Sequence, residues 1–462
     1  MTKRIWYLVS FILIAALALA ACAPAVSTEA PAPTTVATEA PVVTQALTEA
    51  PVMTEAPTEA PAVTEAPAVT EAPTEAVAPT AAPASQLSGT VTLWHSWKEN
   101  EIASLNDVIA AFQQQNPNVQ FDVLFVPFDD LRGKFETAAA TGGGPTVLIG
   151  AADWGPAEYD ADLVADLSGL ASQDLLSSIN EAALGAVKYK DAIIGMPETI
   201  KGVVMFRNTS IIPDAPASVD DLITAAKAAT QGDVVGADLE RGFFFSAAHL
   251  NGIGGQLMTD TGDPAFNNDK GVEWLNLLKS FSDAGPTEYY TDNDVDLFKQ
   301  GKAGIIIDGS WNAAALADAI GADNLSIDPW PTAGDGHLSG YVQTENIYLS
   351  TNAEGADKDA SWAFIEYFMS PEAQKILAEP TKAAHLPAVA GVEVSDPLQE
   401  QIIAAFQDGT AFPVIPEMGA YWTPMDTALQ SVFDQGTDPA AALTTAEESI
   451  NAAIADIRSG NK

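Results

Sequence analysis

The spacing of hydrophobic and polar residues changes repeatedly from residue 89 onward, and each change marks an expected element. Residues 89–97 (GTVTLWHSW) alternate, so that Val91, Leu93 and His95 fall on one face. This period of two predicts a first strand. Apolar residues then recur at helical spacing through 101–117 (EIASLNDVIAAFQQQNP), and the Asn-Pro pair at its end predicts where the helix stops.

The alternation of strand and helix continues beyond this point. Residues 119–126 (VQFDVLFV) are predicted to form a strand, 129–142 (DDLRGKFETAAATG) a helix, and 142–150 (GGGPTVLIG) a buried strand. Such an order favours an α/β fold, with mostly parallel strands flanked by helices. In folds of this kind ligands gather beyond the carboxyl ends of the strands.

The stretch AGIIIDGSWN (303–312) raises the question of what a tryptophan does at the end of a strand. The three isoleucines predict a strand buried on both faces, and Gly309 and Ser310 mark where the backbone leaves the sheet. Trp311 follows at the rim of the sheet. From the residues alone it either packs under the next helix, as tryptophans usually do, or faces a cleft.

Composition then narrows the class of function. The 462 residues include 62 acidic and 20 basic side chains, for a formal charge of −42 at pH 7. This charge repels phosphate backbones, so nucleic acid is not an expected partner. The length leaves room for two large lobes or for several domains.

Neither the histidines nor an acidic run predicts a metal centre. The four histidines, at positions 95, 249, 337 and 385, lack the spacing of metal ligands. The run DNDVD (292–296) lacks the rest of a calcium loop and is expected to begin a helix. No cofactor and no metal is therefore expected.

The first 21 residues have the three-part arrangement of a signal peptide. Lys3 and Arg4 precede the apolar run IWYLVSFILIAALALA, and small residues follow it. The run ends in LAAC, where Cys22 is the only cysteine of the chain and so has no partner for an internal disulfide. LAAC resembles the bacterial lipobox, which implies cleavage before Cys22 and attachment of lipid to it. The alternative is an uncleaved anchor, for which the run is short; in both cases the protein is exported.

Residues 22–86 are predicted to be a disordered linker. The unit TEAP occurs seven times between residues 28 and 73, and bulky residues are scarce between the copies. Proline at this density prevents helix and sheet hydrogen bonding and favours an extended, solvated backbone. We expect this segment to act as a tether that lets the folded part extend away from its membrane anchor.

Blocks spread over residues 89–462 resemble the extracellular solute-binding proteins of ABC importers. In the first half these are GTVTLWHSW, AAATGGGPTVLIG followed by ADW, and GMPET. In the second half FKQGKAGIIIDGSW, SWAFIEYFMSPEAQ, HLPA and IPEMGAYW resemble, in order, the maltose/maltodextrin-binding branch. The resemblance implies a type II periplasmic-binding-protein fold of two α/β lobes joined by hinge crossings.

The expected lobes each combine two separate parts of the chain. The N-terminal lobe is expected to comprise 87–199 and 346–400, and the C-terminal lobe 200–345 and 401–462. The crossings between them are expected near 198–203, 341–346 and 398–404.

The resemblance also implies a function without catalysis. A monomeric lipoprotein, anchored through Cys22 on the outer face of the cytoplasmic membrane, would capture a sugar or oligosaccharide between two closing lobes. The permease subunits of an ABC importer would then recognise the closed form. These partners are implied by the family and are not visible in the residues themselves.

Aromatic residues are the first expected ligand contacts. Trp311 and Trp422 match the tryptophans that lie against a sugar face in similar proteins, and Tyr421 stands beside Trp422. A flat indole complements the apolar C–H face of a pyranose. Further tryptophans at the ends of the first and third expected strands are Trp94, Trp97 and Trp154.

The polar candidates depart from the maltose-binding pattern. Asp153 matches the acid that accepts sugar hydroxyls, but Trp154 follows it where that branch has arginine. Lys201 and Arg241 stand where carboxylates are expected, with Phe243 near a usual tyrosine. Carbohydrate remains the expected class, maltose itself is in doubt, and an acidic sugar stays open. Further candidates, equally compatible with structural roles, are Glu345 on the second crossing strand, His95, Glu198, Asn251 and Glu417.

Two other classes of function stay open. A glycoside hydrolase also combines acids with aromatic residues, but no local motif here pairs two carboxylates. A receptor for a polyamine or another cation fits the acidic charge and the tryptophans, whereas Lys201 and Arg241 at the expected site disfavour it.

Overall fold

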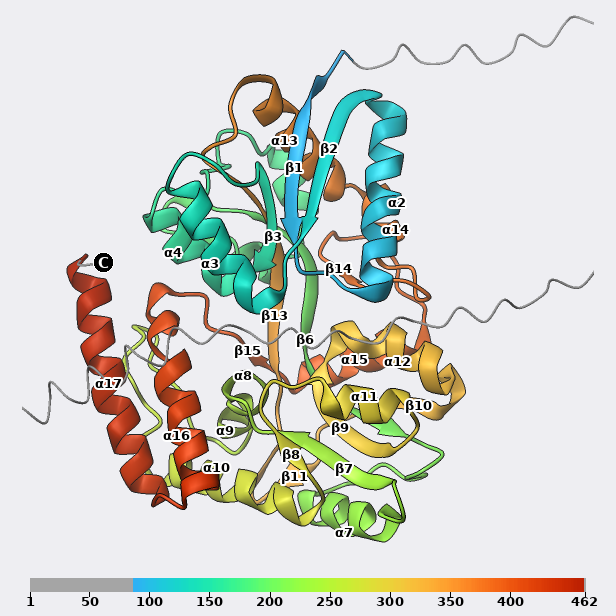
Figure 1. Cartoon of the computed structure of the whole chain (residues 1–462), viewed down its shortest axis with the longest axis vertical. Helices are drawn as coiled ribbons and strands as arrows, with labels where there is room; N and C mark the ends of the chain where they lie inside the picture. Colours follow the sequence, from blue (N-terminus) through green and yellow to red (C-terminus); the bar gives the residue numbers. More distant parts are fainter. Residues whose placement is uncertain (1–85, 461–462) are drawn as a thin grey trace, which may run out of the picture. The chain divides into compact units, whose positions relative to one another are not determined.

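One large sheet contains strands from both the early and the late parts of the described chain. The computed structural model describes residues 86–460; the predicted signal peptide, Cys22 and the repeats up to residue 85 lie outside them. The strand order is β2-β1-β3-β13-β6-β9-β7-β8, and helices lie on both sides of the sheet (Figure 1).

The first three strands are parallel, as the strand–helix alternation predicts. β1 pairs with β2 on one side and with β3 on the other. The apolar residues that recur at helical spacing in α2 are buried, except Ile102, and Asn116 caps the helix end. All five expected elements of this region are confirmed. Their bounds are β1 Ser88–His95, α2 Glu99–Gln115, β2 Asn118–Phe125, α3 Phe128–Ala139 and β3 Val147–Ala151.

Two long strands, β6 (Met196–Asn208) and β13 (Tyr341–Leu349), join the two halves of the sheet. β13 pairs antiparallel with β3 on one side and with β6 on the other. Past this contact, β6 continues and pairs with β9 through residues 203–207. The first two expected crossings therefore fall within strands that both halves share.

The second half of the sheet contains the isoleucine strand. β9 is buried along its whole length, as the sequence predicts, and it pairs in parallel with β7. The acidic run at 292–296 begins helix α11, also as predicted. The bounds in this half are α7 Val219–Ala229, β7 Val235–Glu240, α10 Asp269–Ser280, β8 Thr287–Glu288, α11 Asn293–Lys299, β9 Ala303–Gly309, α12 Ala313–Ile320, β10 Leu325–Asp328, α16 Trp422–Gln435 and α17 Pro439–Ser459.

Two large hydrophobic cores define the two lobes. The core of the N-terminal lobe combines β1, β3 and α2 with α13 (Gly355–Phe368) and α14 (Pro371–Leu377), so the chain returns to this lobe after β13. The core of the C-terminal lobe combines β7 and β9 with α10, α16 and α17. The division explains why each lobe needs two separate parts of the chain.

The third expected crossing coincides with a helix. α15 (Pro397–Gln407) spans the whole of 398–404, and its Ile402 packs with Phe206 and Ile306 in a third, smaller core. The residue boundaries of the lobes stay a prediction. Of the helices within residues 86–460, none has the length and apolar content needed to cross a bilayer.

The remaining short elements connect these parts. They are η2 Ala152–Trp154, α4 Gly155–Asp160, α5 Gln173–Ser178, α6 Glu181–Gly185, β4 Lys188–Tyr189, β5 Ala192–Ile193, α8 Phe243–Ser246, α9 Ala248–Gly252, η3 Phe281–Asp283, η4 Ser310–Asn312, η5 Ala322–Asn324, β11 Thr332–Ala333, β12 Gly336–His337, β14 Leu386–Pro387, β15 Thr410–Ala411 and η6 Pro416–Ala420.

Candidate ligand-binding site

Short 3-10 turns after the sheet strands meet where the lobes face each other. η2, which follows β3 in the N-terminal lobe, contacts η6, which precedes α16 in the C-terminal lobe. η4 follows β9 and contacts β6. Because α/β folds bind their ligands beyond the carboxyl ends of the strands, the side chains around these turns form the candidate site.

Trp311 folds back over the end of β9. A Cβ atom added at Gly309 would lie 2.0 Å from two carbons of the Trp311 ring, so only glycine leaves space for the indole here. Asn312 donates to Asp308 Oδ1 at 2.8 Å and closes the same turn. Trp311 is only partly buried, and part of its surface stays open.

Three partly buried aromatic rings, including that of Trp311, lie side by side near the end of β9. Phe244 lies between Trp311 and Trp422, with centroid distances of 6.4 and 6.3 Å and interplanar angles of 32° and 25°. The buried rings of Tyr341 and Phe412 contact Phe244 at 6.2 and 5.7 Å. We call these five side chains the aromatic platform. Its partly exposed members present near-parallel faces.

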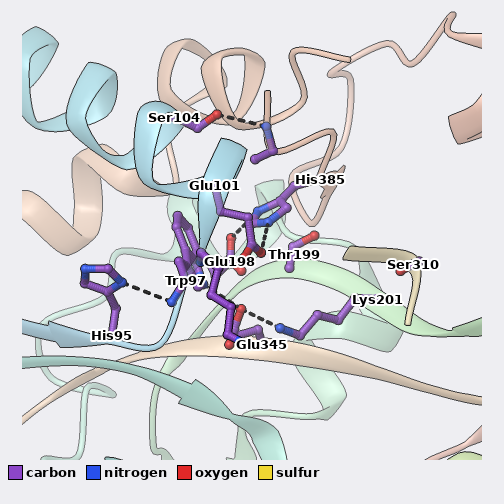
Figure 2. Close-up of polar contacts among 12 residues, drawn as sticks. His95, Trp97, Glu101, Ser104, Glu198, Thr199, Lys201, Ser310, Glu345 and His385 are labelled. Carbon is purple, nitrogen blue, oxygen red and sulfur yellow. Dashed lines mark hydrogen bonds and ion pairs between the residues drawn. The ribbon is translucent and has the colours of Figure 1, made fainter. Parts of the chain in front are cut away.

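A charged pair lies beside Trp311. The Nζ atom of Lys201 lies 5.2 Å from the centre of the Trp311 ring, within cation–π range, and 2.7 Å from Oε2 of Glu345. The indole N–H of Trp97 donates to the same oxygen at 2.9 Å (Figure 2). Burial acts to raise the pKa of Glu345, but Lys201 and Trp97 outweigh it and hold this pKa below its usual range. Both members of the pair therefore carry charge and neutralise each other.

Next to this pair, His385 lies between two carboxylates. Its Nδ1 is 3.2 Å from Oε2 of Glu198, and its Nε2 is 3.1 Å from Oε1 of Glu101 (Figure 2). Burial acts to lower the pKa of His385, but the two carboxylates raise it to about 10. Burial also raises the pKa of Glu198 to about 7. The histidine is thus a buried cation that ties α2 to β6.

Asp153 approaches the platform from the N-terminal lobe. Its carboxylate interacts with the side chain of Trp422, so the two lobes touch at this point. Burial raises the pKa of Asp153 to about 6, against the lowering effect of Arg132 and Trp422. Arg132 itself donates to Glu136 and Glu158, each at 3.0 Å.

A cavity of about 780 Å³ is also lined by both lobes. Asp160 and Tyr189 come from the N-terminal lobe, and Glu417 and Arg458 are among the residues that the C-terminal lobe contributes. This volume is within the ~300–1,000 Å³ that small-molecule sites occupy.

The model of the bacterial extracellular solute-binding protein family matches residues 107–408, well over half of the chain. The chain belongs to this family. The solute-binding protein is 25% identical over 361 residues to the maltotriose-binding protein of Pyrococcus abyssi, covering 75% of this chain and 78% of that one. It is 28% identical over 302 residues to a maltooligosaccharide ABC transporter solute-binding lipoprotein of Streptococcus pneumoniae, covering 61% and 68%.

A solved structure confirms the expected fold. The maltose/maltodextrin-binding domain MalE of Bdellovibrio bacteriovorus, bound to maltotriose, superposes with a TM-score of 0.73 at 22% identity, covering 80% of this chain and 100% of that chain. The two-lobe, type II, maltose-binding-like fold that the resemblance implies is therefore the fold of this solute-binding protein.

The three tryptophans expected from the N-terminal lobe are largely buried in this solute-binding protein. Trp97 is 2% exposed and bonded to Glu345, Trp154 is 6% exposed, and Trp94 is 9% exposed beneath the Lys134 ammonium. The Trp154 ring occupies the space where a side chain at Gly150 would lie. The ligand roles of these tryptophans stay predictions.

Two exposed phenylalanines of the N-terminal lobe escaped the sequence analysis. Phe125 is 43% exposed at the end of β2, and Phe128 is 48% exposed at the start of α3. Phe128 lies 5.2 Å from the ring of Trp154, and Phe125 lies 6.0 Å from His95. Both lie at the carboxyl edge of the parallel strands. Phe125 ends a strand and Phe128 follows it closely, which was the available signal, but the sequence analysis considered only tryptophans at such positions.

The run of three phenylalanines at 243–245 includes one predicted ligand contact, Phe243, whose ligand role stays a prediction. Phe243, the predicted residue, is fully buried and meets Trp422 edge-on at 5.6 Å. Phe244 instead occupies the centre of the platform. The chain turns into α8 at Gly242, and the helical turn decides which ring faces outward.

Arg241 and Tyr421 have contacts inside the C-terminal lobe. Arg241 is 7% exposed and donates to the carbonyl oxygens of Leu278 and Lys279 at the end of α10. The hydroxyl of Tyr421 donates to the carbonyl of Gly262 at 2.9 Å, and its ring is fully buried. The structure does not bring either residue together with Lys201 and Trp311, and their ligand roles stay predictions.

The remaining polar candidates are dispersed. His95 is buried and accepts from the backbone N–H of Trp97, whereas Glu417 pairs with Arg458 at 3.0 Å. Asn251 lines a separate small pocket. Within residues 86–460, no group of acidic, histidine or cysteine side chains has the arrangement of a metal site.

Proposed function

We propose that this solute-binding protein captures a sugar or oligosaccharide between its two lobes and delivers it to an ABC importer. The observation that carries the proposal is the aromatic platform, in which Trp311, Phe244 and Trp422 keep part of their ring surface open. Exposed aromatic surface is costly in water, and near-parallel rings suit a flat ligand with an apolar face. The C–H face of a pyranose is such a surface.

The size of the platform fits micromolar binding. If Trp311 and Trp422 each cover about 100 Å² of apolar surface, they contribute about 5 kcal/mol at ~25 cal/mol per Å². A micromolar ligand needs about 8 kcal/mol. The remainder would come from hydrogen bonds. Asp153, beside Trp422, and the Lys201–Glu345 pair, beside Trp311, are the nearest polar groups for them.

The charges beside the platform favour a neutral ligand over an acidic one. Lys201, the nearest cation, is already paired with Glu345 at 2.7 Å. Arg241, the second basic candidate, donates to carbonyls of α10. An acidic sugar would have to compete with the Glu345 carboxylate for Lys201.

Lobe closure is the proposed mechanism. Asp153 and Trp422 touch across the lobes, so a sugar that enters replaces this contact with contacts to both partners. A ligand favours the closed arrangement only through its higher affinity for that arrangement. The importer's permease would recognise the closed form, and the protein would act as a monomer without hydrolysing its ligand.

Membrane attachment completes the proposal. Cleavage before Cys22 and lipidation of its thiol would anchor the protein on the outer face of the cytoplasmic membrane, and the repeat segment would act as the tether. The lipoprotein among its relatives supports this arrangement.

A thermal-shift screen tests the proposal. The full chain, in a detergent without a sugar headgroup, is heated with maltotriose, a galacto-oligosaccharide, an acidic sugar and spermidine. A ligand that binds the folded form raises the unfolding midpoint, and raises it further at higher ligand concentration. We expect a neutral saccharide to raise it. A shift with spermidine alone would support a cation receptor instead, and cleaved saccharide after incubation would indicate a hydrolase.

A further inference from the structure

Four acidic side chains are buried together in the C-terminal lobe, where β7, β8, α11 and β9 meet. They are Glu240, Glu288, Asp294 and Asp308, and each is less than a tenth exposed. Glu240 and Glu288 are paired in the register of β7 and β8, and the backbone N–H of Asp294 donates to Oε1 of Glu288 at 3.2 Å. Asp308 acts electrostatically on both Asp294 and Glu240. We call these four side chains the carboxyl cluster.

No cation within residues 86–460 neutralises the carboxyl cluster, because none of its four members is ion-paired with a lysine, an arginine or a histidine. The neighbouring strand and helix add further acids, since Asp238 of β7 is buried and Asp318 of α12 is exposed. Asp292, which precedes α11, pairs with Lys98 at the surface, and Lys299, at the far end of α11, pairs with α2. A buried acid without a counter-charge is costly to ionise, so it holds a proton instead.

Glu288 and Asp294 share one of these protons. Their side chains hydrogen-bond each other, which two carboxyl groups can do only when one of them is protonated. Thr291 donates its hydroxyl to Oε2 of Glu288, and the backbone N–H of Val295 donates to Oδ1 of Asp294 at 2.6 Å. Oδ2 of Asp294 accepts from no donor among the described residues, so it is the oxygen free to hold the proton.

The carboxyl cluster adjoins the turn that carries Trp311. Oδ1 of Asp308 accepts from the backbone N–H of Gly309 and, at 2.8 Å, from Nδ2 of Asn312. Trp311 lies between these two donors in the sequence, and its ring fills the space over Gly309. Helix α11 packs on β9 (Figure 1). A change of charge at Asp294 therefore reaches the aromatic platform through Asp308 and its turn.

We propose that Asp294 is a positioning residue for Trp311: the proton that Asp294 shares with Glu288 keeps α11 seated against β9, and with it the turn that carries the indole. Asp294 itself does not touch the ligand. Its effect on saccharide binding rests on the proposed function of the platform, whereas its effect on the order of the turn does not.

The arrangement responds to alkaline pH. Burial raises the pKa of Asp308 to about 7 and that of Glu240 to about 8, and burial together with the neighbouring acids also raises the pKa of Asp294. Because these values lie above those of the unfolded chain, the stability that the cluster contributes is complete below about pH 4 and is lost as the pH rises through about 7 to 8. The new charges repel one another between α11 and β9, so the turn loosens and saccharide affinity falls.

Two substitutions on the same helix test the proposal. Asp294→Asn cannot ionise, but its amide still donates to Glu288, and Asp296→Asn, at an exposed position of α11, is the matched control. Each full-length protein, in a detergent without a sugar headgroup, is titrated calorimetrically with maltotriose at pH 6 and pH 9. Hydrogen exchange of the backbone amides of residues 308–312, corrected for the intrinsic rate at each pH, reports on the turn without any ligand.

We expect the wild-type protein and Asp296→Asn to lose maltotriose affinity and amide protection to the same extent between pH 6 and pH 9. In Asp294→Asn both losses should be at least threefold smaller, because the bond to Glu288 no longer depends on a proton that can leave. Asp294→Ala removes this bond and should lower protection of the turn at both pH values. If that variant does not fold, the conservative Asp294→Asn still decides.

Equal losses of protection between pH 6 and pH 9 in the wild-type protein, Asp294→Asn and Asp296→Asn would overturn the proposal. A merely structural role for Asp294 would give this result, because the substitution would then change protection equally at both pH values. Failure of the proposed function looks different: maltotriose would not bind the wild-type protein, while the exchange measurements would still decide the role of Asp294.

Discussion

At the scale of single residues, space and exposure decide which side chains a ligand meets. Trp311 lies over Gly309, where no other residue leaves room, and this contact turns the indole toward Phe244 and Trp422. Trp97 and Trp154, which the sequence also offers as candidate ligand contacts, are buried. Two predictions follow from single positions.

The first prediction concerns the space above Gly309. In Gly309→Ala the new methyl group collides with the Trp311 ring, so the indole must move. We expect saccharide affinity to fall roughly tenfold or more, as loss of one stacked ring implies, and the free energy of unfolding to fall by about 1–3 kcal/mol. Calorimetry and urea unfolding measure both. Gly133→Ala, in helix α3 with open space around it, is the control and should bind normally.

The second prediction concerns the exposed ring of Phe128. Because it is 48% exposed, Phe128→Ala should cost less than about 1 kcal/mol of stability. If the ring forms the opposite wall of the sugar site, affinity should drop several-fold. Ile403→Ala, at 39% exposure on α15, is the matched control. Equal saccharide affinities of Phe128→Ala and Ile403→Ala would show that Phe128 does not contact the ligand.

At the scale of elements, buried charges join segments that are distant in sequence. Trp97 donates to a carboxylate 248 residues away, and the same carboxylate pairs with Lys201 of β6. His385, just before β14, links α2 to β6 through Glu101 and Glu198. These contacts fix the turns that carry the site.

The third prediction is a loss of stability at alkaline pH. His385 has a pKa of about 10 in the folded protein against an ordinary 6.5, so its contribution is complete below about pH 6.5 and is lost as the pH rises toward 10. Glu198, with its pKa raised to about 7, acts in the same direction from about pH 4.5 upward. Urea unfolding should therefore give a lower free energy at pH 9 than at pH 6.

A histidine substitution isolates this effect. His385→Gln removes the buried cation that Glu101 and Glu198 share, which should cost about 3–5 kcal/mol at pH 6 and flatten the dependence between pH 6 and 9. His337→Gln, at a partly buried position in β12, is the control and should keep the wild-type slope. An unchanged slope in His385→Gln would show that other groups cause the pH dependence.

The sequence predicts the elements better than it predicts the site. The spacing of apolar residues can be followed along a short segment of the chain, so β1, α2 and β9 can be predicted directly from it. The pairing of Lys201 with Glu345 depends on how β6 and β13 align, which no local pattern contains. Likewise, the choice of Phe244 over Phe243 depends on where α8 begins, and the exposure of Phe125 depends on its strand lying at the sheet edge.

At the scale of the whole molecule, the sheet that passes from one lobe to the other allows both to contribute to one site. β6 and β13 belong to both halves, and Asp153 and Trp422 meet beyond them. Other contacts between the lobes, such as Lys299 with Glu99 at 2.9 Å, are partly exposed pairs that contribute little energy. The ligand itself is therefore expected to supply most of the preference for closure.

The fourth prediction separates attachment from binding. Cys22→Ser removes the thiol that would carry lipid, so the protein should move from the membrane fraction to the soluble fraction of the cell envelope or the medium. Its saccharide affinity should stay unchanged, because Cys22 precedes the folded part. Membrane fractionation with calorimetry on both forms measures this. Retention in the membrane fraction would favour an uncleaved anchor.

The central claim, that a sugar stacks on the aromatic platform, is tested most directly by titrating the saccharide found in the thermal screen into Trp311→Ala and Trp422→Ala. Trp362→Ala, a partly buried tryptophan on α13 in the N-terminal lobe, is the matched control. We predict a loss of roughly tenfold or more in affinity for each platform variant and wild-type affinity for the control. Wild-type affinity in both platform variants would contradict the account.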